Sequence, residues 1–273
     1  MHNQEHRLHL VRFVSVPSLV LALQYLAYGQ ATTQPATPTR DPQAATLVGQ
    51  AITALTGGKA ASDATLNGQA TRTAGSDVET GTAVLQAKGH LESKIALTLS
   101  GGSWQEIWSD SQGSWTGPDG QSHSQAFHNS LVIGNWFCPA VALQALAADT
   151  SFGLAYVAAE TRQGVQVQHI QSTRILPGAG TAPDPVIQQL TAIELYLDAT
   201  TFLPVALEFN THPDFDALRN LPVRVELGNY QSVNGIGAPF HIQKFLQGSL
   251  FLDISVSTAA FNSGLSDAVF AIP

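Results

Sequence analysis

The chain has 273 residues, of which 44% are hydrophobic and only 12% charged, about half the usual charged fraction. Its formal net charge is −8, and the sequence contains no block of Lys or Arg residues. Nucleic-acid binding is therefore excluded, because phosphate contacts need a basic stripe. Electrostatic docking on anionic lipid is disfavoured for the same reason. The length suits one large domain or two small ones.

Residues 1–29 match a secretory signal peptide. A basic segment that contains Arg7 and Arg12 precedes an apolar run, which is shorter than the roughly 20 residues of a membrane-spanning helix. Small residues permit cleavage after Gly29 or after Ala31. The sequence therefore predicts export to the periplasm, with no stable membrane span after cleavage. The alternative is an uncleaved N-terminal helix that anchors the protein.

Residues 30–40 are rich in Pro, Thr and Ala, which predicts a disordered linker. The folded domain is predicted to span residues 41–273. Its first helix is expected over Pro42–Leu55, because Asp41 suits the N-cap position and apolar residues recur at three- and four-residue spacing. The glycines that follow it end the helix.

Most of the remaining chain alternates apolar and polar residues with a period of two, which is typical of antiparallel strands with one buried face. About ten such strands are present. A second helix is expected over Asn129–Ala148, with a break near Phe137 because Pro139 must start or kink a helix. A short third helix is predicted at Pro185–Leu190.

These elements indicate an α+β fold that is mostly antiparallel β. The apolar face of a sheet must be covered or closed on itself, and two or three helices cannot cover ten strands. Strong curvature around the helices solves this and leaves a concave apolar cavity that accepts an apolar ligand. The alternative is close packing without a cavity.

Three C-terminal segments carry a family resemblance. They are the strand, turn and Leu-Pro sequence at 193–204, the Tyr-x-x-Val-x-Gly-Ile-x-x-Pro hairpin at 230–242, and the closing Phe261-Asn262 with Phe270-Ala271-Ile272-Pro273. In these segments the chain resembles the bacterial outer-membrane lipoprotein carrier and lipoprotein-sorting proteins. The resemblance implies a strongly curved open half-barrel, closed by two or three helices, whose apolar interior holds acyl chains. These motifs specify turns and no reaction.

The aromatic side chains are the best candidates for ligand contact. Trp104 and Trp108 share one face of a predicted strand, and Trp115 follows in a segment rich in turn residues. Trp136 and Phe137 lie in the apolar second helical segment. Aromatic residues stack on sugars or line lipid entrances. Packing within the core is the alternative.

No sequence motif points to catalysis, a metal or a cofactor. Asp119, His123 and His128 lie close in sequence, but their spacing matches no known metal-ligand set. The single cysteine, Cys138, has apolar neighbours and is interpreted as a buried small hydrophobe.

The prediction is a periplasmic binding or carrier protein, not an enzyme, with an apolar cavity for acyl chains or lipoprotein. One alternative is an envelope sensor or scaffold that docks a protein partner. The least favoured is an envelope hydrolase that uses a His/Asp pair.

Overall fold

The computed structural model describes residues 38–89, 91–176 and 184–273. The predicted signal peptide and most of the predicted linker lie outside the described residues. None of the described helices is both long and apolar enough to cross a membrane.

One antiparallel sheet of thirteen strands dominates the described part of the chain. The α+β, mostly antiparallel fold class is confirmed, with more strands than the ten predicted. The sheet is open, with β6 at one edge, β7 at the other, and β1 paired with β13 in the middle. The strands are β1 (Asp63–Ala74), β2 (Asp77–Lys88), β3 (Glu92–Leu99), β4 (Gly102–Ser109), β5 (Gln112–Thr116), β6 (Ser122–Ser124), β7 (Phe152–Arg162), β8 (Val165–Arg174), β9 (Ile193–Asp198), β10 (Pro204–Thr211), β11 (Leu221–Val233), β12 (Ile236–Leu246) and β13 (Ser249–Phe261).

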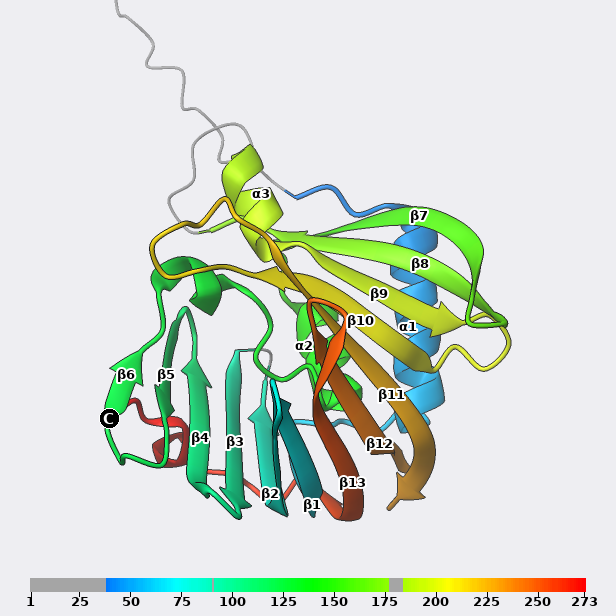
Figure 1. Cartoon of the computed structure of the whole chain (residues 1–273). Coiled ribbons are helices and arrows are strands. Elements are labelled where there is room, and N and C mark those ends of the chain that lie inside the picture. Colours follow the sequence, from blue (N-terminus) through cyan, green and yellow to red (C-terminus); the bar gives the residue numbers. More distant parts are fainter. Residues whose placement is uncertain (1–37, 90, 177–183) are drawn as a thin grey trace, which may run out of the picture. The chain divides into compact units, whose positions relative to one another are not determined.

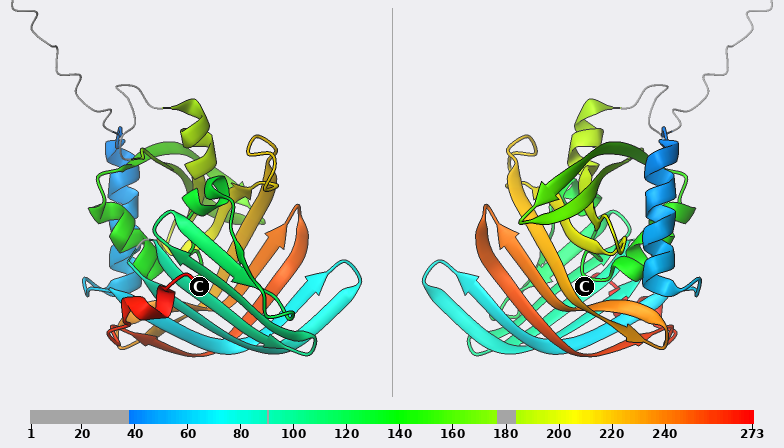
Figure 2. Two further views of the ribbon diagram at one scale, coloured as in Figure 1. Left: turned by 90° about the vertical axis from the view of Figure 1, so that its left-hand side faces the viewer. Right: turned by 90° about the vertical axis from the view of Figure 1, so that its right-hand side faces the viewer.

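Three α-helices and two 3₁₀ helices accompany the sheet in the described ranges. The chain passes from the β6 edge to the β7 edge through η1 (Phe127–Leu131) and α2 (Pro139–Ala148). The connecting segment with η1 and α2 lies on the concave side of the curled sheet, and so does α1 (Pro42–Thr56) (Figures 1 and 2). The predicted half-barrel with helices across its open side is therefore present.

The first helix forms as its sequence predicts. Asp41 accepts a hydrogen bond from the Ala44 amide at 2.9 Å, and Gly57 ends the helix in a left-handed conformation with φ of 57°. Five apolar residues of α1 are buried against the sheet and α2, namely Ala44, Leu47, Val48, Ala51 and Leu55. Burial of this stripe, not helix propensity, holds the helix in place.

The break predicted near Phe137 is confirmed, but the helix predicted before it is not formed, since only the last residues of η1 lie there and residues 132–138 are not helical. Pro139 starts α2, and η1 ends eight residues earlier at Leu131. Ala140, Val141, Ala142 and Leu143 are consecutive and all buried, so α2 is covered on more than one side. Arg40, the last residue of the predicted linker, donates hydrogen bonds to the carbonyls of Leu146 and Ala147. A cation at a helix C-terminus satisfies free carbonyls and complements the helix dipole.

Two glycines permit the strong curvature of the β1–β3 region. A Cβ atom on Gly81 would lie 1.9 Å from the carbonyl oxygen of Thr98 on β3, and one on Gly68 would lie 2.3 Å from that of Ser255 on β13. The register of the β1–β13 pair also shifts at Asn67/Gly68. Bulges and glycines of this kind mark close approach and local bending of strands.

The C-terminal segment covers the convex side of β3 and β4. Phe270, in η2 (Asp267–Phe270), is completely buried, and Ile107 on the outer face of β4 is 3% exposed. Asp63 holds this segment by accepting hydrogen bonds from the amides of Ser263 at 2.8 Å and Gly264 at 3.0 Å. Burial raises the pKa of Asp63, but the hydrogen bond from the Ser263 hydroxyl, together with those from the backbone amides, outweighs it, so the pKa lies below its usual value.

The turns singled out in the C-terminal motifs are present. Asp198 accepts hydrogen bonds from the amides of Thr201 at 2.7 Å and Thr200 at 3.0 Å. These bonds, that of Thr201 above all, lower the pKa of Asp198. Gly235 has φ of 82° in the β11–β12 turn, where other residues are strained.

Candidate functional site

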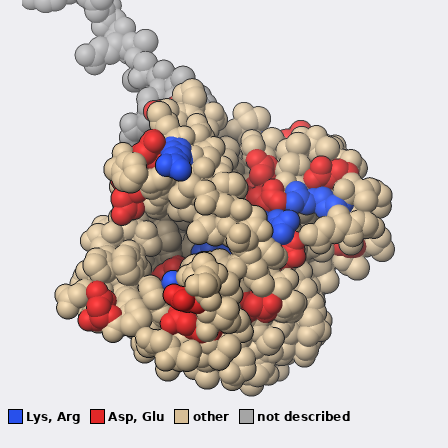
Figure 3. Space-filling model, viewed as in Figure 1, with Lys and Arg blue, Asp and Glu red and all other residues tan. Residues whose placement is uncertain are grey.

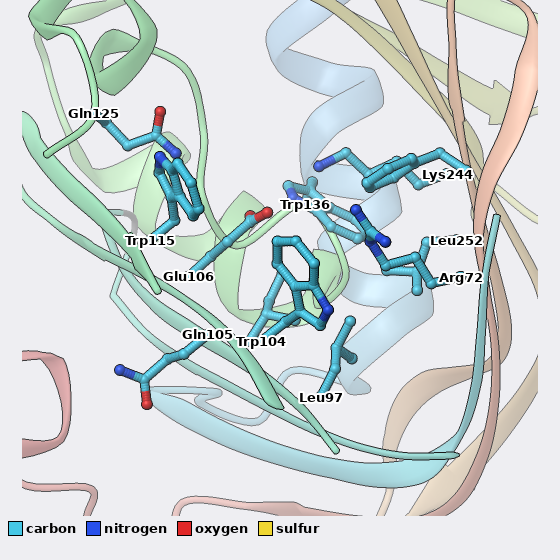
Figure 4. Close-up of a pocket in the computed structure, with 12 residues that line it drawn as sticks. Arg72, Leu97, Trp104, Gln105, Glu106, Trp115, Gln125, Trp136, Lys244 and Leu252 are labelled. Carbon is cyan, nitrogen blue, oxygen red and sulfur yellow. The ribbon is translucent and has the colours of Figure 1, made fainter. Parts of the chain in front are cut away.

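A pocket of about 270 Å³ opens on the concave side of the sheet, away from α1. One wall comes from β3, β4 and β5, and the facing wall comes from β1, β12 and β13. Figure 3 shows a hollow on this face with acidic and basic atoms at its mouth, and Figure 4 shows the side chains around it. The lining residues are Arg72, Ile95, Leu97, Trp104, Gln105, Glu106, Trp115, Gln125, Trp136, Lys244, Phe251 and Leu252.

Aromatic and cationic groups stack along this pocket. Trp104 and Trp115 lie with ring centres 6.5 Å apart and 21° between their planes, and Trp115 stacks on His123 at 4.2 Å. The guanidinium of Arg72 lies 4.1 Å from the ring centre of Trp104. Strands β2 and β3 separate these two residues in the sheet, so three strand spacings of roughly 4.8 Å lie between them. The curvature of the sheet and the length of the Arg72 and Trp104 side chains therefore bring these two groups into contact.

Three charged side chains line the pocket, and their partners differ. Arg72 forms an ion pair of 3.0 Å with Glu79. Lys244 places its ammonium 4.9 Å from the centre of the Trp136 ring. Within the described residues, neither Lys244 nor Glu106 has a hydrogen-bond or ion-pair partner. Glu106 reaches into the space from the opposite wall to Arg72 and Lys244 (Figure 4).

A second space of about 140 Å³ continues inward from the pocket. Both spaces are lined by the same central residues, among them Glu106, Trp136 and Lys244, so these mark the junction. Trp108 lines only the inner space and packs so closely on Gly134 that a Cβ there would lie 2.7 Å from the indole ring.

The helix side of the half-barrel is almost filled. Between α1, α2 and strands β7–β10 the free space measures about 20 Å³, and apolar side chains such as Leu143 and Leu195 line it. The expected cavity between sheet and helices is thus reduced to a small gap. The open space lies instead beside β3–β5, because α1 and α2 pack on the other half of the sheet.

The five predicted ligand-contact residues fall into three positions. Trp104, Trp115 and Trp136 line the larger pocket, while Trp108 lines the inner space. Phe137 is completely buried and packs edge-to-face on Trp136 at 5.6 Å. It is not among the residues that line either space.

His123 and His128 do not share a site, although the Nε2 atom of His123 lies 3.9 Å from a carboxylate oxygen of Asp119, where both side chains are exposed. His123 stacks on Trp115, whereas His128 bonds the Pro213 carbonyl at 3.1 Å. The described residues contain no group of three His, Cys, Asp or Glu side chains suited to a metal ion. Cys138 is completely buried, as predicted, and burial raises its pKa to about 12, so its thiol is a poor nucleophile.

The charged pocket residues were not singled out from the sequence, although a signal was present. Arg72, Glu106 and Lys244 each occupy an inward-facing position of an alternating strand. A charge in such a position is unusual unless it serves a site. Strict alternation places Phe251 on the opposite face of β13 from its neighbour Leu252, yet both residues line the pocket. The β12–β13 register shifts at this point, so Phe251 is left without a cross-strand partner and turns inward.

The described residues thus form an open, curled antiparallel sheet with a tryptophan-lined pocket on its concave side. No protein-family model matches the chain, and no curated protein sequence matches it significantly. Solved structures do match. A LolA superfamily protein from Nitrosomonas europaea is 14% identical with a TM-score of 0.53, over 84% of this chain and 97% of that one.

Two further structures give the same result. A structure described as an outer-membrane lipoprotein-sorting protein domain, from Vibrio parahaemolyticus, is 12% identical with a TM-score of 0.50, over 82% of this chain and 94% of its own. A DUF1329 family protein from Desulfovibrio piger is 13% identical with a TM-score of 0.51, over 84% of this chain and 96% of that one. At these identities the likeness concerns the fold alone. The resemblance to the lipoprotein-carrier proteins is therefore confirmed as a shared fold.

Proposed function

We propose that this chain is an exported binding or carrier protein that holds an acyl chain or a comparable apolar ligand. The observation that carries the proposal is the pocket of about 270 Å³ walled by Trp104, Trp115 and Trp136. Ile95 and Leu97 extend this apolar wall. Apolar surface left uncovered on the inside of a curled sheet favours an apolar ligand, because binding removes that surface from water.

The size of the pocket limits the ligand. Its volume lies just below the roughly 300–1,000 Å³ of small-molecule sites. One hydrocarbon chain suits this space better than the several acyl chains of a lipoprotein. The ligand is therefore proposed to be a small amphiphile with one chain.

Lipid binding is tested on the purified chain without residues 1–29. Native mass spectrometry of protein taken directly from cells is expected to show one bound lipid-sized mass per chain. Titration with a fluorescent fatty acid is expected to saturate at one probe per chain. Trp115→Ala removes a stacking wall and is expected to weaken binding about tenfold, since an aromatic contact contributes on the order of 1 kcal/mol beyond its buried area.

The matched control is Phe215→Ala, because Phe215 is 87% exposed and lies outside the pocket. This variant is expected to bind the fatty acid like the unchanged protein. A chain that binds no apolar probe and carries no lipid from cells contradicts the proposal.

The periplasmic location is part of the same proposal. It is tested by fractionation of cells and N-terminal sequencing of the periplasmic protein. The expected N-terminus follows Gly29 or Ala31. A membrane-bound protein that retains Met1 contradicts cleavage and supports the anchored alternative.

A second candidate function, docking of a protein partner in the envelope, is favoured by one surface feature. Phe127, Phe215 and Leu218 are large apolar residues with exposed fractions of 60%, 87% and 65%. Phe127 begins η1, which bonds to the segment after β10 through His128 and Pro213. The two segments lie side by side in Figure 1. Exposed apolar patches of this kind mark interaction surfaces.

The two functions respond to different variants. If docking is the function, Phe215→Ser with Leu218→Ser abolishes co-purification of a stoichiometric envelope partner, and Trp115→Ala does not. If lipid binding is the function, the opposite pattern is expected in the fatty-acid titration.

A further inference from the structure

The two charges at the junction of the pocket and the inner space carry an inference about the ligand's head group. Glu106 on β4 and Lys244 on β12 line both spaces. They are not paired with each other, because no ion pair within 4.0 Å joins them in the described structure. A gap therefore separates a carboxylate and an ammonium that face the same space (Figure 4).

A ligand that fills this junction displaces water from both charges. Removing water from a charge without supplying a partner is strongly unfavourable. An anionic head group satisfies Lys244 and leaves Glu106 without a partner. A cationic head group does the reverse. Only a head group with both charges satisfies the two side chains together.

The surroundings assign each charge to one side. Arg72 lies on the same wall as Lys244 in Figure 4, and its ion pair with Glu79 uses one of its five N–H donors. This wall therefore suits an acid group. Glu106 lies between Trp115 and Trp136 in the same view, where a carboxylate and indole rings suit an ammonium group.

We infer that the ligand is a zwitterionic amphiphile. Its acid group pairs with Lys244 and Arg72, its ammonium group pairs with Glu106, and its hydrocarbon chain lies along Ile95, Leu97 and Leu252. The inference rests on the proposed function and narrows its ligand class.

Four decyl compounds test the inference, each titrated below its critical micelle concentration into the purified chain without residues 1–29. They are decylphosphocholine, decyl phosphate, decyltrimethylammonium and decanol, which share the chain and differ in head-group charge. Decylphosphocholine is expected to bind about tenfold more tightly than each of the others, the scale of one contact to a charged group.

Charge variants separate the two halves of the head-group site. Lys244→Met is expected to weaken the binding of decylphosphocholine about tenfold. The affinity for decyltrimethylammonium is expected to stay unchanged or to increase. Glu106→Gln is expected to shift the preference to decyl phosphate. Lys94→Met is the matched control, because Lys94 lies on the convex face of β3, and it is expected to change nothing. Thermal melting confirms that each variant is folded.

The outcomes distinguish the two levels of the proposal. Equal affinity for all four compounds, unaltered by Lys244→Met and Glu106→Gln, overturns the zwitterion and leaves an apolar-ligand carrier. A preference for decanol or for one singly charged compound also overturns it. Failure of every decyl compound to bind contradicts the proposed function, and the zwitterion with it.

Discussion

Gly81 occupies a position at which the sheet admits no side chain. A Cβ there would lie 1.9 Å from the backbone oxygen of Thr98, and backbone atoms move only if the strands separate. We expect Gly81→Ala to lower the free energy of unfolding by about 1–3 kcal/mol or more, the usual cost of overpacking. Urea denaturation measures the difference.

Gly228→Ala is the control for this prediction. Gly228 is also within a strand, β11, but a Cβ atom added to it would meet no other atom within 4 Å. Alanine there is expected to be neutral or slightly stabilising, because it restricts the unfolded chain. If Gly81→Ala were as neutral as Gly228→Ala, the approach of β2 to β3 at Gly81 would be looser than described.

His212 makes stability depend on pH. It is 3% exposed, and its Nδ1 lies 3.2 Å from the Arg219 carbonyl oxygen. Burial, with a smaller effect of nearby His128, lowers the pKa of His212, although the hydrogen bond to Arg219 and the charge of Asp216 oppose this. The unfolded chain therefore takes up this proton at a higher pH than the folded protein does.

The sign of the pH effect follows from that difference. Above the unfolded pKa of about 6.5, His212 is neutral in both the folded and the unfolded state, and its contribution to the free energy of unfolding does not vary with pH. As the pH falls below this value, the unfolded state binds the proton first, so the free energy of unfolding decreases. His212→Asn is expected to flatten the urea-denaturation stability profile between about pH 7.5 and 5, and the exposed-site variant His123→Gln to retain the slope.

At the scale of elements, the C-terminal η2 acts as a cover for the outer face of β3 and β4. Phe270 is completely buried there, on the side opposite the pocket. Phe270→Ala is expected to lower the free energy of unfolding by about 3–5 kcal/mol and to leave ligand affinity unchanged. Val78→Ala, at a residue 61% exposed, is the control for loss of an apolar side chain without burial. A large loss of affinity in Phe270→Ala with normal stability would contradict this assignment.

Elements with strong periodicity were predictable, and those without it were not. The helix at Pro42 and the break before Pro139 follow from capping and proline geometry, which act within a few residues. Strands β5 and β6 were missed because Gly, Ser and Asp dominate their surroundings. Pairing with β4 stabilises β5 and pairing with β5 stabilises β6, and such tertiary contacts override weak local preference.

At the scale of the whole molecule, the pocket arises from how the sheet curls. Arg72, Trp104 and Lys244 come from three strands, with Lys244 far from the other two in sequence, and no local pattern places them together. Alternation indicates which face most strand residues occupy, and Phe251, at the shift in the β12–β13 register, is an exception. Alternation does not indicate which residues meet across the concave side, because the bulges and glycines that bend the sheet determine that.

The same curvature divides the interior into a filled half and an open half, which separates stability from binding. Leu143 on α2 lines the gap of about 20 Å³, whereas Leu97 on β3 lines the pocket of about 270 Å³. Leu143→Ala leaves a cavity among close-packed atoms, so it is expected to cost about 2–5 kcal/mol and to lower the melting temperature by roughly 4–15 °C. Its fatty-acid affinity is expected to be unchanged.

Leu97→Trp has the opposite expected effect. The larger ring extends into open space, so overpacking is partly relieved and the melting temperature is expected to change by only a few degrees. The ring fills the volume that the ligand chain needs, so fatty-acid affinity is expected to fall by about tenfold or more. If Leu143→Ala weakened binding as much as Leu97→Trp, the ligand would lie on the helix side. A single packed core that shares both roles would then replace the division between the two halves.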